Sequence, residues 1–576
     1  MSWLFGFLGQ HLSPESVERF HSLHPKPILE FHSRTTYLAA GGLPETCLHG
    51  SFSDSQHGEG WTVCGLGMER KEQTHRFLQA ADWQRLLALE HPPLQKLDGH
   101  FLAIRWKTNE AQCFTDQLGL RTLFIAQVNG GTVFSTRLAW IASLREHNEV
   151  DFAACGPAWL TFNQIGCEAF LKDVHRLGPN GIAVITPTST RMHSIPWRPD
   201  PNTGTAEFAD VLQTLLYPDT NTGRTISLGL SGGLDSRTLL ALLASRNEGT
   251  FALHVFGRPE DPDVRTSQSI AHNEKFTQSH FHEPLPEAAT CMRMLRDYAS
   301  QTQFIEPAST FLKLRYFPQL HTRGKVIIDG GFGEIARRQF LNRLLLKGKS
   351  ALLSGRPDRI YSFLHVQRPA IFTPEILQTM RQGVEEQIAS LWQVMPSIKD
   401  FGCENFLDLL AIRMRLANYY GFEQSRMDGE CVNYMPFAQP SLLNSLFKTP
   451  IHLRKNGRLF RQLIRRHFPR LCQYPLVKNG VTYPFNFSPV PAWAWTNLKV
   501  RLGQKFIDTE AVDFLRLIAA EVQDLVHSAS VKSFPAYDYP FIRNIVEKFY
   551  HGQTEFASQV HWWLSFELWR TSVNAA

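Results

Sequence analysis

The sequence predicts a two-domain protein of α+β and α/β class: stacked antiparallel sheets come first, and a doubly wound parallel sheet with a helical extension follows. The length is the first reason, because 576 residues exceed what one hydrophobic core usually holds. Short alternating apolar segments separated by turns fill the first 200 residues, which is typical of antiparallel strands. Later, apolar runs alternate with helical patterns, which favours a parallel sheet. We therefore expect domains over 1–200 and 205–576, joined by the proline-rich stretch 196–204.

Composition places the chain among ordinary globular proteins. Hydrophobic residues make up 43% and charged residues 19% of the chain, and the formal net charge is +6. Because this charge is spread along the chain, no nucleic-acid partner is expected. No window approaches the roughly 20 apolar residues of a membrane-spanning helix, and the nine cysteines include no Cys-x-x-Cys pair, which is typical of a reducing compartment. We therefore expect a soluble, cytoplasmic protein without a membrane span.

In the first domain, alternation of apolar and polar residues predicts individual strands. Turn-forming stretches such as Asp98-Gly99 and Asn129-Gly130-Gly131 separate them. The predicted strands are Phe101–Trp106, Gln112–Thr115, Leu123–Val128, Thr132–Ser135 and Gly181–Thr186.

The second domain opens with a strand, a glycine turn and a helix. Residues 226–230 form an apolar run typical of a buried strand, and residues 236–245 have the leucine spacing of a helix. Such a turn directs backbone N–H groups and the positive end of the helix dipole at an anion. Glycines lack a Cβ and let the backbone approach a phosphate closely. The pattern predicts a phosphate-binding loop, and the plain alternative is a glycine turn before a core helix. The turn consists of Ser231, Gly232, Gly233, Leu234, Asp235 and Ser236.

This loop differs from the two commonest nucleotide-binding loops. No Gly-Lys-Ser/Thr follows the glycines, and the spaced glycines of the dinucleotide fingerprint are missing. Residues 231–236 resemble instead the pyrophosphate loop of the ATP pyrophosphatases, which split ATP between its α and β phosphates. The resemblance implies that this loop binds ATP and that Asp235 helps to hold Mg²⁺.

Further motifs extend the resemblance along the chain. Together with the loop they resemble the asparagine synthetase family, whose members include β-lactam synthetases and lasso-peptide cyclases. The resemblance implies an Ntn-hydrolase-like, class II glutamine amidotransferase-like first domain, an ATP-pyrophosphatase second domain, and an adenine site at the backbone around Phe256 and Gly257. The amidotransferase-like motifs are Met1–Gly6, Leu97–Phe101, Asp116–Arg121, Phe134–Thr136 and Arg176–Gly181.

Two departures in the first domain affect glutamine chemistry. Ser2 stands where the family has a catalytic cysteine, and a hydroxyl is far less ionised than a thiol. The family's glutamine-binding Asn-Gly-Glu stretch should fall near residues 65–68, where neither the Asn nor the Glu is present. We therefore expect an inactive glutaminase domain retained for structure or for holding an acceptor. The rival interpretation is that Ser2, exposed by removal of Met1, still acts as a nucleophile.

A second glycine turn follows the β-branched run 326–328. It resembles the family's Gly-x-Gly-x-Asp-Glu loop, which implies that Asp329 and Gly330 bind the nucleotide and that Glu334 serves catalysis by binding Mg²⁺. Ile335 follows Glu334 where the family has a second acid. The plain alternative is that Glu334 merely caps a helix over 335–346.

A lysine near the end of the second domain completes the implied site. Lys478 matches by position the lysine that, in the family, neutralises charge while the adenylate forms and breaks down. A preorganised cation near developing negative charge lowers a reaction barrier. A lone lysine without this context would be an ordinary surface residue.

The resemblance implies an ATP-dependent, AMP-forming carbon–nitrogen ligase. It would adenylate a substrate carboxylate and join it to an amine without glutamine hydrolysis, which favours an intramolecular cyclase or ligase such as a lasso-peptide macrolactam synthetase. A peptide delivered by a partner protein is compatible with this. One alternative is an ammonia-dependent amidotransferase acting on a small or glycan-linked carboxylate. Another is a catalytically inactive scaffold, because Ser2, Ile335 and Tyr434 depart from the family pattern.

Overall fold

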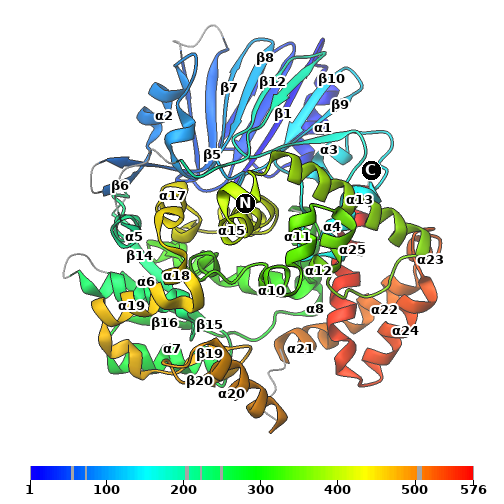
Figure 1. The fold of residues 1–576 in the computed structure, drawn as a ribbon. Helices are drawn as coiled ribbons and strands as arrows, with labels where there is room; N and C mark the ends of the chain where they lie inside the picture. The colour runs from blue at the N-terminus through cyan, green and yellow to red at the C-terminus, as the bar shows by residue number, and fades with distance from the viewer. Residues whose placement is uncertain are drawn as a thin grey trace.

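Two antiparallel sheets form the first part of the chain (Figure 1). The computed structural model describes residues 2–52, 58–71, 74–200, 207–220, 223–246, 251–301, 303–502 and 509–574. The 6-stranded sheet has the order β11-β9-β10-β1-β3-β2, and the 7-stranded sheet has the order β13-β12-β8-β7-β5-β4 with β6 paired to β5. The strands are β1 (Trp3–Gly9), β2 (Leu29–His32), β3 (Thr36–Gly41), β4 (Cys47–Ser51), β5 (Gly60–Lys71), β6 (Thr74–Phe77), β7 (Asp98–Lys107), β8 (Glu110–Thr115), β9 (Leu123–Val128), β10 (Gly131–Ser135), β11 (Val174–Leu177), β12 (Ile182–Ile185) and β13 (Thr190–His193).

These two sheets are stacked around a shared apolar core. Leu8 and Leu38 of the first sheet belong to the same buried cluster as Leu102 and Ile104 of the second. Each of the five strands predicted by alternation is present. Most residues of β7, β9 and β10 are buried on both faces of their strands, because each sheet is covered on two sides. Four helices accompany the sheets: α1 (Pro14–Leu23), α2 (Ala80–Leu87), α3 (Leu138–Ala142) and α4 (Phe152–Leu160).

A 5-stranded parallel sheet organises the second part of the chain. Its order is β16-β15-β14-β17-β18, so the chain builds outward from β14 in one direction and then resumes on the other side with β17. Ligands of doubly wound folds bind where the strand order reverses in this way. The predicted fold class is confirmed. The strands are β14 (Thr225–Gly229), β15 (Phe251–Phe256), β16 (Gln278–Phe281), β17 (Lys325–Ile328) and β18 (Val432–Tyr434).

Helices cover this sheet and extend beyond it. The last helix is largely buried: Trp563 and Trp569 have exposed fractions of 0% and 1%. The helices are α5 (Phe208–Leu216), α6 (Leu234–Ser245), α7 (Pro262–Asn273), α8 (Ala288–Gln301), α9 (Phe317–Thr322), α10 (Asn342–Lys347), α11 (Lys349–Ser354), α12 (Pro357–Leu364), α13 (Pro374–Val394), α14 (Ile398–Phe401), α15 (Cys403–Arg415), α16 (Gly421–Met427), α17 (Pro440–Lys448), α18 (Ile451–Arg454), α19 (Arg458–His467), α20 (Pro489–Arg501), α21 (Thr509–Leu517), α22 (Ala519–His527), α23 (Ala529–Lys532), α24 (Tyr539–Tyr550) and α25 (Ala557–Asn574).

The two parts of the chain pack closely through α4 and α13. A methyl group on Gly156 would lie 2.0 Å from the carbonyl oxygen of Met380, and one on Gly383 would lie 2.0 Å from that of Ala153. Only glycine permits this approach of the two helix backbones. The contact therefore fixes the first part of the chain against the helical extension of the second.

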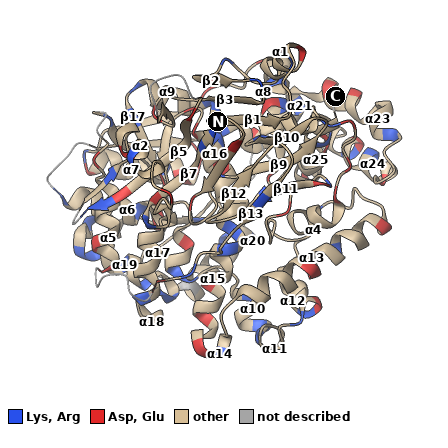
Figure 2. Cartoon of the chain, turned by 90° about the horizontal axis from the view of Figure 1, so that it is seen from above, with Lys and Arg blue, Asp and Glu red and all other residues tan. Residues whose placement is uncertain are grey.

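Charged residues of both signs are scattered over most elements (Figure 2). Within the described ranges, the helices all lack the combination of length and apolar character that crossing a bilayer requires.

Candidate functional site

The two predicted glycine loops meet at the switch point between β14 and β17. A methyl group on Gly330 would lie 2.8 Å from the backbone nitrogen of Ser236 and 3.0 Å from Cβ of Asp235. A methyl group on Gly333 would lie 2.6 Å from Cγ of Asp235. The loop after β17 thus rests directly on the loop after β14, and both contact positions require glycine.

Hydrogen bonds to side-chain oxygens fix the conformation of the loop after β14. The Ser231 N–H donates to Ser236 Oγ at 3.2 Å, and the two hydroxyl oxygens lie 3.0 Å apart. The Gly232 N–H donates to Asp263 at 2.8 Å, and the Gly233 N–H to Ser231 Oγ at 3.2 Å. Gly233 occupies the N-cap position of α6 without a side-chain capping bond. The first turn of a 12-residue helix therefore begins at this loop with its dipole uncapped.

A cavity of about 330 Å³ lies against this helix start, and we call it the loop cavity. Five of the residues predicted from sequence line it: Gly233, Leu234, Asp235, Glu334 and Lys478. Arg337 and Arg461 line it as well. Arg461 belongs to α19, in which basic residues alternate with buried apolar residues such as Phe460 and Ile464.

A second cavity of about 330 Å³, the inner cavity, lies beneath the loop after β17. Asp329 lines it together with Arg415, Tyr420 and Glu423. Glu334 lines both cavities. Arg415, Tyr420 and Glu423 lie outside the motifs on which the sequence analysis depends, so none of the three was assigned from the sequence.

Burial raises the pKa of several carboxyl groups in these cavities. The pKa of Asp235 is raised to about 6, mainly by burial and further by Glu334, although Arg337 opposes the shift. Burial also raises the pKa of Asp329, and Glu334 adds to that effect. The pKa of Glu423 is raised to about 8 by burial and by repulsion from Glu306 and Asp329. Such shifted groups are able to exchange protons near neutral pH.

Asp235 forms an ion pair with Arg337. The Arg337 Nη2–H donates to Asp235 Oδ2 at 2.6 Å, and Arg337 Nε lies 2.5 Å from Asp235 Oδ1. Arg337 comes from the short 3₁₀ turn Gly333–Arg337, which also carries Glu334. After this turn, Arg338 and Leu341 adopt left-handed backbone angles, with φ of 55° and 56°. The alternative of a Glu334-capped helix over 335–346 is therefore wrong, because α10 begins only at Asn342.

Lys478 ends the first strand of a small hairpin, β19 (Leu476–Lys478) with β20 (Val481–Tyr483). The Val477 N–H donates to the Gly232 carbonyl at 3.0 Å, which fastens the hairpin to the loop. Arg237, fully buried in α6, donates to the carbonyls of Tyr474 and Pro475 at 2.7 Å each. Arg237 is therefore a positioning residue for Lys478. No local pattern around Arg237 indicates this role in advance.

Phe256 and Gly257 lie at the end of β15 and do not line either cavity. The Phe256 ring is stacked on Tyr316, with centroids 5.3 Å apart and an interplanar angle of 11°. The Gly257 N–H donates to the Phe281 carbonyl at 3.2 Å. An adenine site at this backbone stays a prediction.

Magnesium fits the loop cavity only together with a phosphate ligand. Among the described residues, no group of three or more His, Cys, Asp or Glu side chains is arranged to hold a metal ion. Mg²⁺ is, however, commonly bound by one or two carboxylates plus substrate phosphates and water. Asp235 and Glu334 provide two carboxylates in the same cavity.

Ser2 is fully buried and is bonded to Arg121. The Arg121 guanidinium donates to Ser2 Oγ and to the Asp428 carboxylate, and it also donates to the Ser2 carbonyl at 3.2 Å. Tyr434 donates its hydroxyl to the Leu215 carbonyl at 2.6 Å. Both residues thus have structural partners in the described chain.

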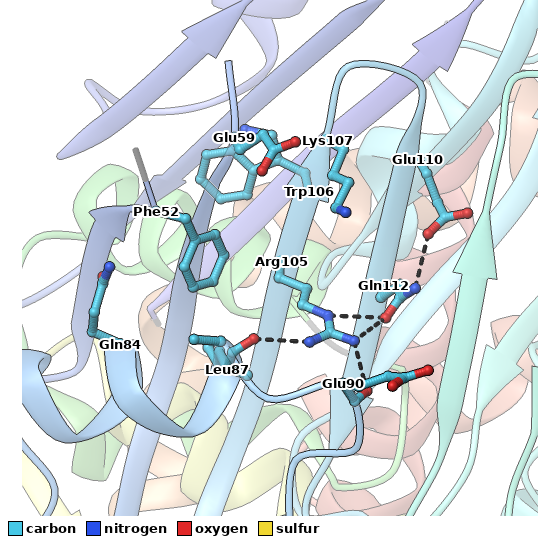
Figure 3. A pocket seen from close by; sticks show the side chains of 11 residues that line it. Phe52, Glu59, Gln84, Leu87, Glu90, Arg105, Trp106, Lys107, Glu110 and Gln112 are labelled. Carbon is cyan, nitrogen blue, oxygen red and sulfur yellow. Dashed lines mark hydrogen bonds between the residues drawn. The ribbon is translucent and has the colours of Figure 1, made fainter. Parts of the chain in front are cut away.

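A cavity of about 560 Å³ lies in the first part of the chain, lined by residues between Phe52 and Gln112 (Figure 3). Arg105 is its most central cation, but its guanidinium donates to Gln112 at 2.9 and 2.7 Å and to the carbonyl of Leu87 at 2.8 Å. Its hydrogen-bond donors are used within the protein, as the dashed lines in Figure 3 show, and none of the residues to which the sequence analysis gave a catalytic or binding role lines this cavity. We therefore place the candidate site at the two cavities of the second domain.

Comparisons with known proteins give distant structural likeness. No protein-family model matches the chain, and no curated protein sequence matches it. Among solved structures, one similar chain is glutamine phosphoribosylpyrophosphate amidotransferase from B. subtilis, complexed with ADP and GMP, with 12% identity, a TM-score of 0.23, and coverage of 58% of this chain and 77% of that chain. Another is described as the allosteric regulatory enzyme of purine biosynthesis, with 11% identity, a TM-score of 0.21, and coverage of 67% and 91%. Likeness of this degree carries no argument about the activity of this chain.

Proposed function

We propose that the chain is an ATP-dependent amide ligase that forms AMP and pyrophosphate. The observation that carries this proposal is that Glu334 lines both the loop cavity and the inner cavity. The loop cavity offers a helix start and cations suited to a polyphosphate. The inner cavity offers polar groups suited to an organic substrate. A carboxylate in the inner cavity would thus meet the α-phosphate of ATP next to Glu334.

In this reaction a substrate carboxylate oxygen attacks the α-phosphorus, and the bond to the pyrophosphate oxygen breaks. Lys478 and the N–H groups at the start of α6 would stabilise the departing charge, since preorganised donors are most effective where charge develops. Asp235 and Glu334 would hold Mg²⁺, which when bound supplies further positive charge to the phosphates.

The second step forms the amide. An amine attacks the acyl carbon, and AMP leaves with the bonding electrons. The amine must lose a proton, and Glu423 is the inner-cavity carboxyl best suited to accept it, because its pKa is raised to about 8.

The amine is proposed to come from the substrate and not from glutamine. Ser2 is enclosed and its oxygen accepts a hydrogen bond from Arg121, which lowers its nucleophilicity. This supports ring closure or ligation, as in a lasso-peptide macrolactam synthetase, with a peptide delivered by a partner protein. The size of the inner cavity, about 330 Å³, favours a second candidate: an ammonia-dependent amidotransferase acting on a small or glycan-linked carboxylate.

The test is exchange of labelled pyrophosphate into ATP by the purified chain, with Mg²⁺ and candidate carboxylates. We expect exchange with the true substrate, AMP as the product, and loss of exchange in Lys478→Ala and Asp235→Ala. Lys399→Ala, on the exposed face of α14, is the matched control and should exchange like the wild type. Formation of ADP, or full exchange by Asp235→Ala, would overturn the proposal.

The same assay separates the candidates. Loss of one water mass from a substrate bearing both groups, without added ammonia, identifies a cyclase. A requirement for ammonia identifies the amidotransferase. No exchange with any carboxylate, together with no thermal shift by ATP, leaves the inactive scaffold as the correct interpretation.

A further inference from the structure

The loop cavity holds more cations than the predicted lysine. Arg337, Arg461 and Lys478 line it from three separate segments, against the carboxylates of Asp235 and Glu334. The inner cavity has the opposite balance, with Asp329, Glu334 and Glu423 against Arg415 among its charged lining residues. The difference in charge marks the loop cavity as the end that receives an anion.

Two of these cations are fixed by the surrounding backbone. Arg461 donates from Nε to the Phe485 carbonyl at 3.1 Å and from Nη2 to the Phe487 carbonyl at 2.9 Å. Lys478 is carried by the hairpin that is bonded to the loop through Gly232. Because these anchors are neutral carbonyls, they leave the positive charge of Arg461 uncompensated at the cavity.

Arg337 differs, because its charge is compensated by Asp235. The guanidinium covers both carboxylate oxygens, at 2.6 Å and 2.5 Å. Both side chains have exposed fractions of 15%. While this pair is formed, Asp235 Oδ2 accepts a hydrogen bond from Arg337, Asp235 Oδ1 is left without a hydrogen-bond donor among the described residues, and the two opposite charges compensate each other. The pair thereby reduces the attraction of Asp235 for a metal ion and of Arg337 for a phosphate. A ligand that binds here must therefore exchange the pair.

We infer that Arg337 is a pyrophosphate-binding residue, and that its ion pair with Asp235 is a resting contact which the oxygens of a polyphosphate replace. The guanidinium matches two phosphate oxygens as well as it matches a carboxylate. When it turns to phosphate, Asp235 becomes available as a ligand for Mg²⁺. Arg337, together with Arg461 and Lys478, allows the loop cavity to bind pyrophosphate even without a divalent cation. This inference rests on the proposed function only in taking the loop cavity as the polyphosphate end.

The test is titration calorimetry with inorganic pyrophosphate in EDTA, where protein cations alone can act. We expect the wild type to bind, and Arg337→Gln to bind about 10-fold or more weakly, in line with the loss of a bidentate charged contact. Arg465→Gln is the matched control. Arg465 lies one turn after Arg461 in α19, donates to Asn486 Oδ1 at 3.0 Å, and does not line the loop cavity. It should bind within about twofold of the wild type.

The exchange itself is tested with Asp235→Asn. Removing the competing carboxylate should strengthen metal-free binding of pyrophosphate by severalfold, while the gain in affinity on adding Mg²⁺ should shrink. Arg337→Gln leaves Asp235 buried without its partner and risks misfolding. The double variant Arg337→Gln/Asp235→Asn removes both charges, and it should be folded by circular dichroism and bind as weakly as the single arginine variant.

The inference is overturned if the wild type fails to bind pyrophosphate in EDTA, or if Arg337→Gln binds like Arg465→Gln. It is also overturned if Asp235→Asn weakens metal-free binding. Failure of the proposed function gives a different result: pyrophosphate binds as described, but no carboxylate supports exchange into ATP.

Discussion

Asp428 Oδ1 lies 2.9 Å from His100 Nε2 and joins the end of α16 to β7, a strand of the first domain. The same carboxylate pairs with Arg121, and Asn433 Nδ2 donates to it at 2.8 Å. Asp428 and His100 have exposed fractions of 0%. This buried polar cluster therefore connects Ser2 and β7 in the first part of the chain to the end of α16, a helix whose residues line the inner cavity.

Replacing Asp428 by Ala should destabilise the chain strongly. The change leaves the Arg121 guanidinium buried without its carboxylate, which typically costs about 3 to 5 kcal/mol. The measurement is chemical denaturation. Asp513→Ala is the control, because Asp513 pairs with Arg258 at a half-exposed site, where an ion pair contributes about 1 kcal/mol or less. Equal losses in the free energy of unfolding of the two variants would contradict the stabilising role of the buried Asp428 cluster.

Glu423→Gln should change how stability depends on pH. The ordinary pKa of 4.5 is raised to about 8 in the folded chain, so the folded state retains a proton that the unfolded state loses. Stability from this group is full below 4.5 and is lost as pH rises toward 8. The glutamine variant should show a smaller fall in Tm between pH 5 and pH 8.5. An unchanged slope of Tm against pH in the glutamine variant would contradict the raised pKa of Glu423.

Lys478→Ala should lower kcat more than it raises the KM for ATP. Loss of one preorganised charge at a reacting group typically costs about 100- to 1,000-fold in rate. Lys478→Arg should recover part of this, because it keeps the charge but not the shape of the donor. Steady-state kinetics of pyrophosphate release provide the comparison. A variant that changes only KM would show that the lysine binds ATP without assisting the chemical step.

Gly330→Ala should impair nucleotide binding. The added methyl group would meet the Ser236 backbone nitrogen at 2.8 Å, so the two glycine loops must separate. We expect the thermal shift caused by ATP to fall sharply. Gly130→Asn is a tolerated control, because Gly130 has φ of +86° at a turn with open space around it and asparagine accepts left-handed backbone angles. A normal ATP response in Gly330→Ala would contradict the close packing of the loops.

Local patterns predicted much of this fold. Alternation located strands such as β9, whose bounds Leu123–Val128 match the prediction, and leucine spacing located α6. The glycine loops were assigned from short motifs and Lys478 from its position in the family resemblance, and their roles in binding and catalysis stay predictions. The pairing of Arg337 with Asp235 spans 102 residues, and that of Asp428 with His100 spans 328. Contacts of this kind arise from tertiary packing, which the local pattern of a sequence does not encode.

The shared position of Glu334 has a thermodynamic consequence. The Glu334 carboxylate lines both the loop cavity and the inner cavity. A ligand that neutralises this charge in one cavity would therefore change the affinity of the other cavity for its own ligand, and the second ligand would change the affinity for the first by the same factor. If the nucleotide with its counterion and the acceptor favour each other in this way, an unaccompanied ATP is held weakly. Such reciprocity would protect the cell against idle hydrolysis while no acceptor is present.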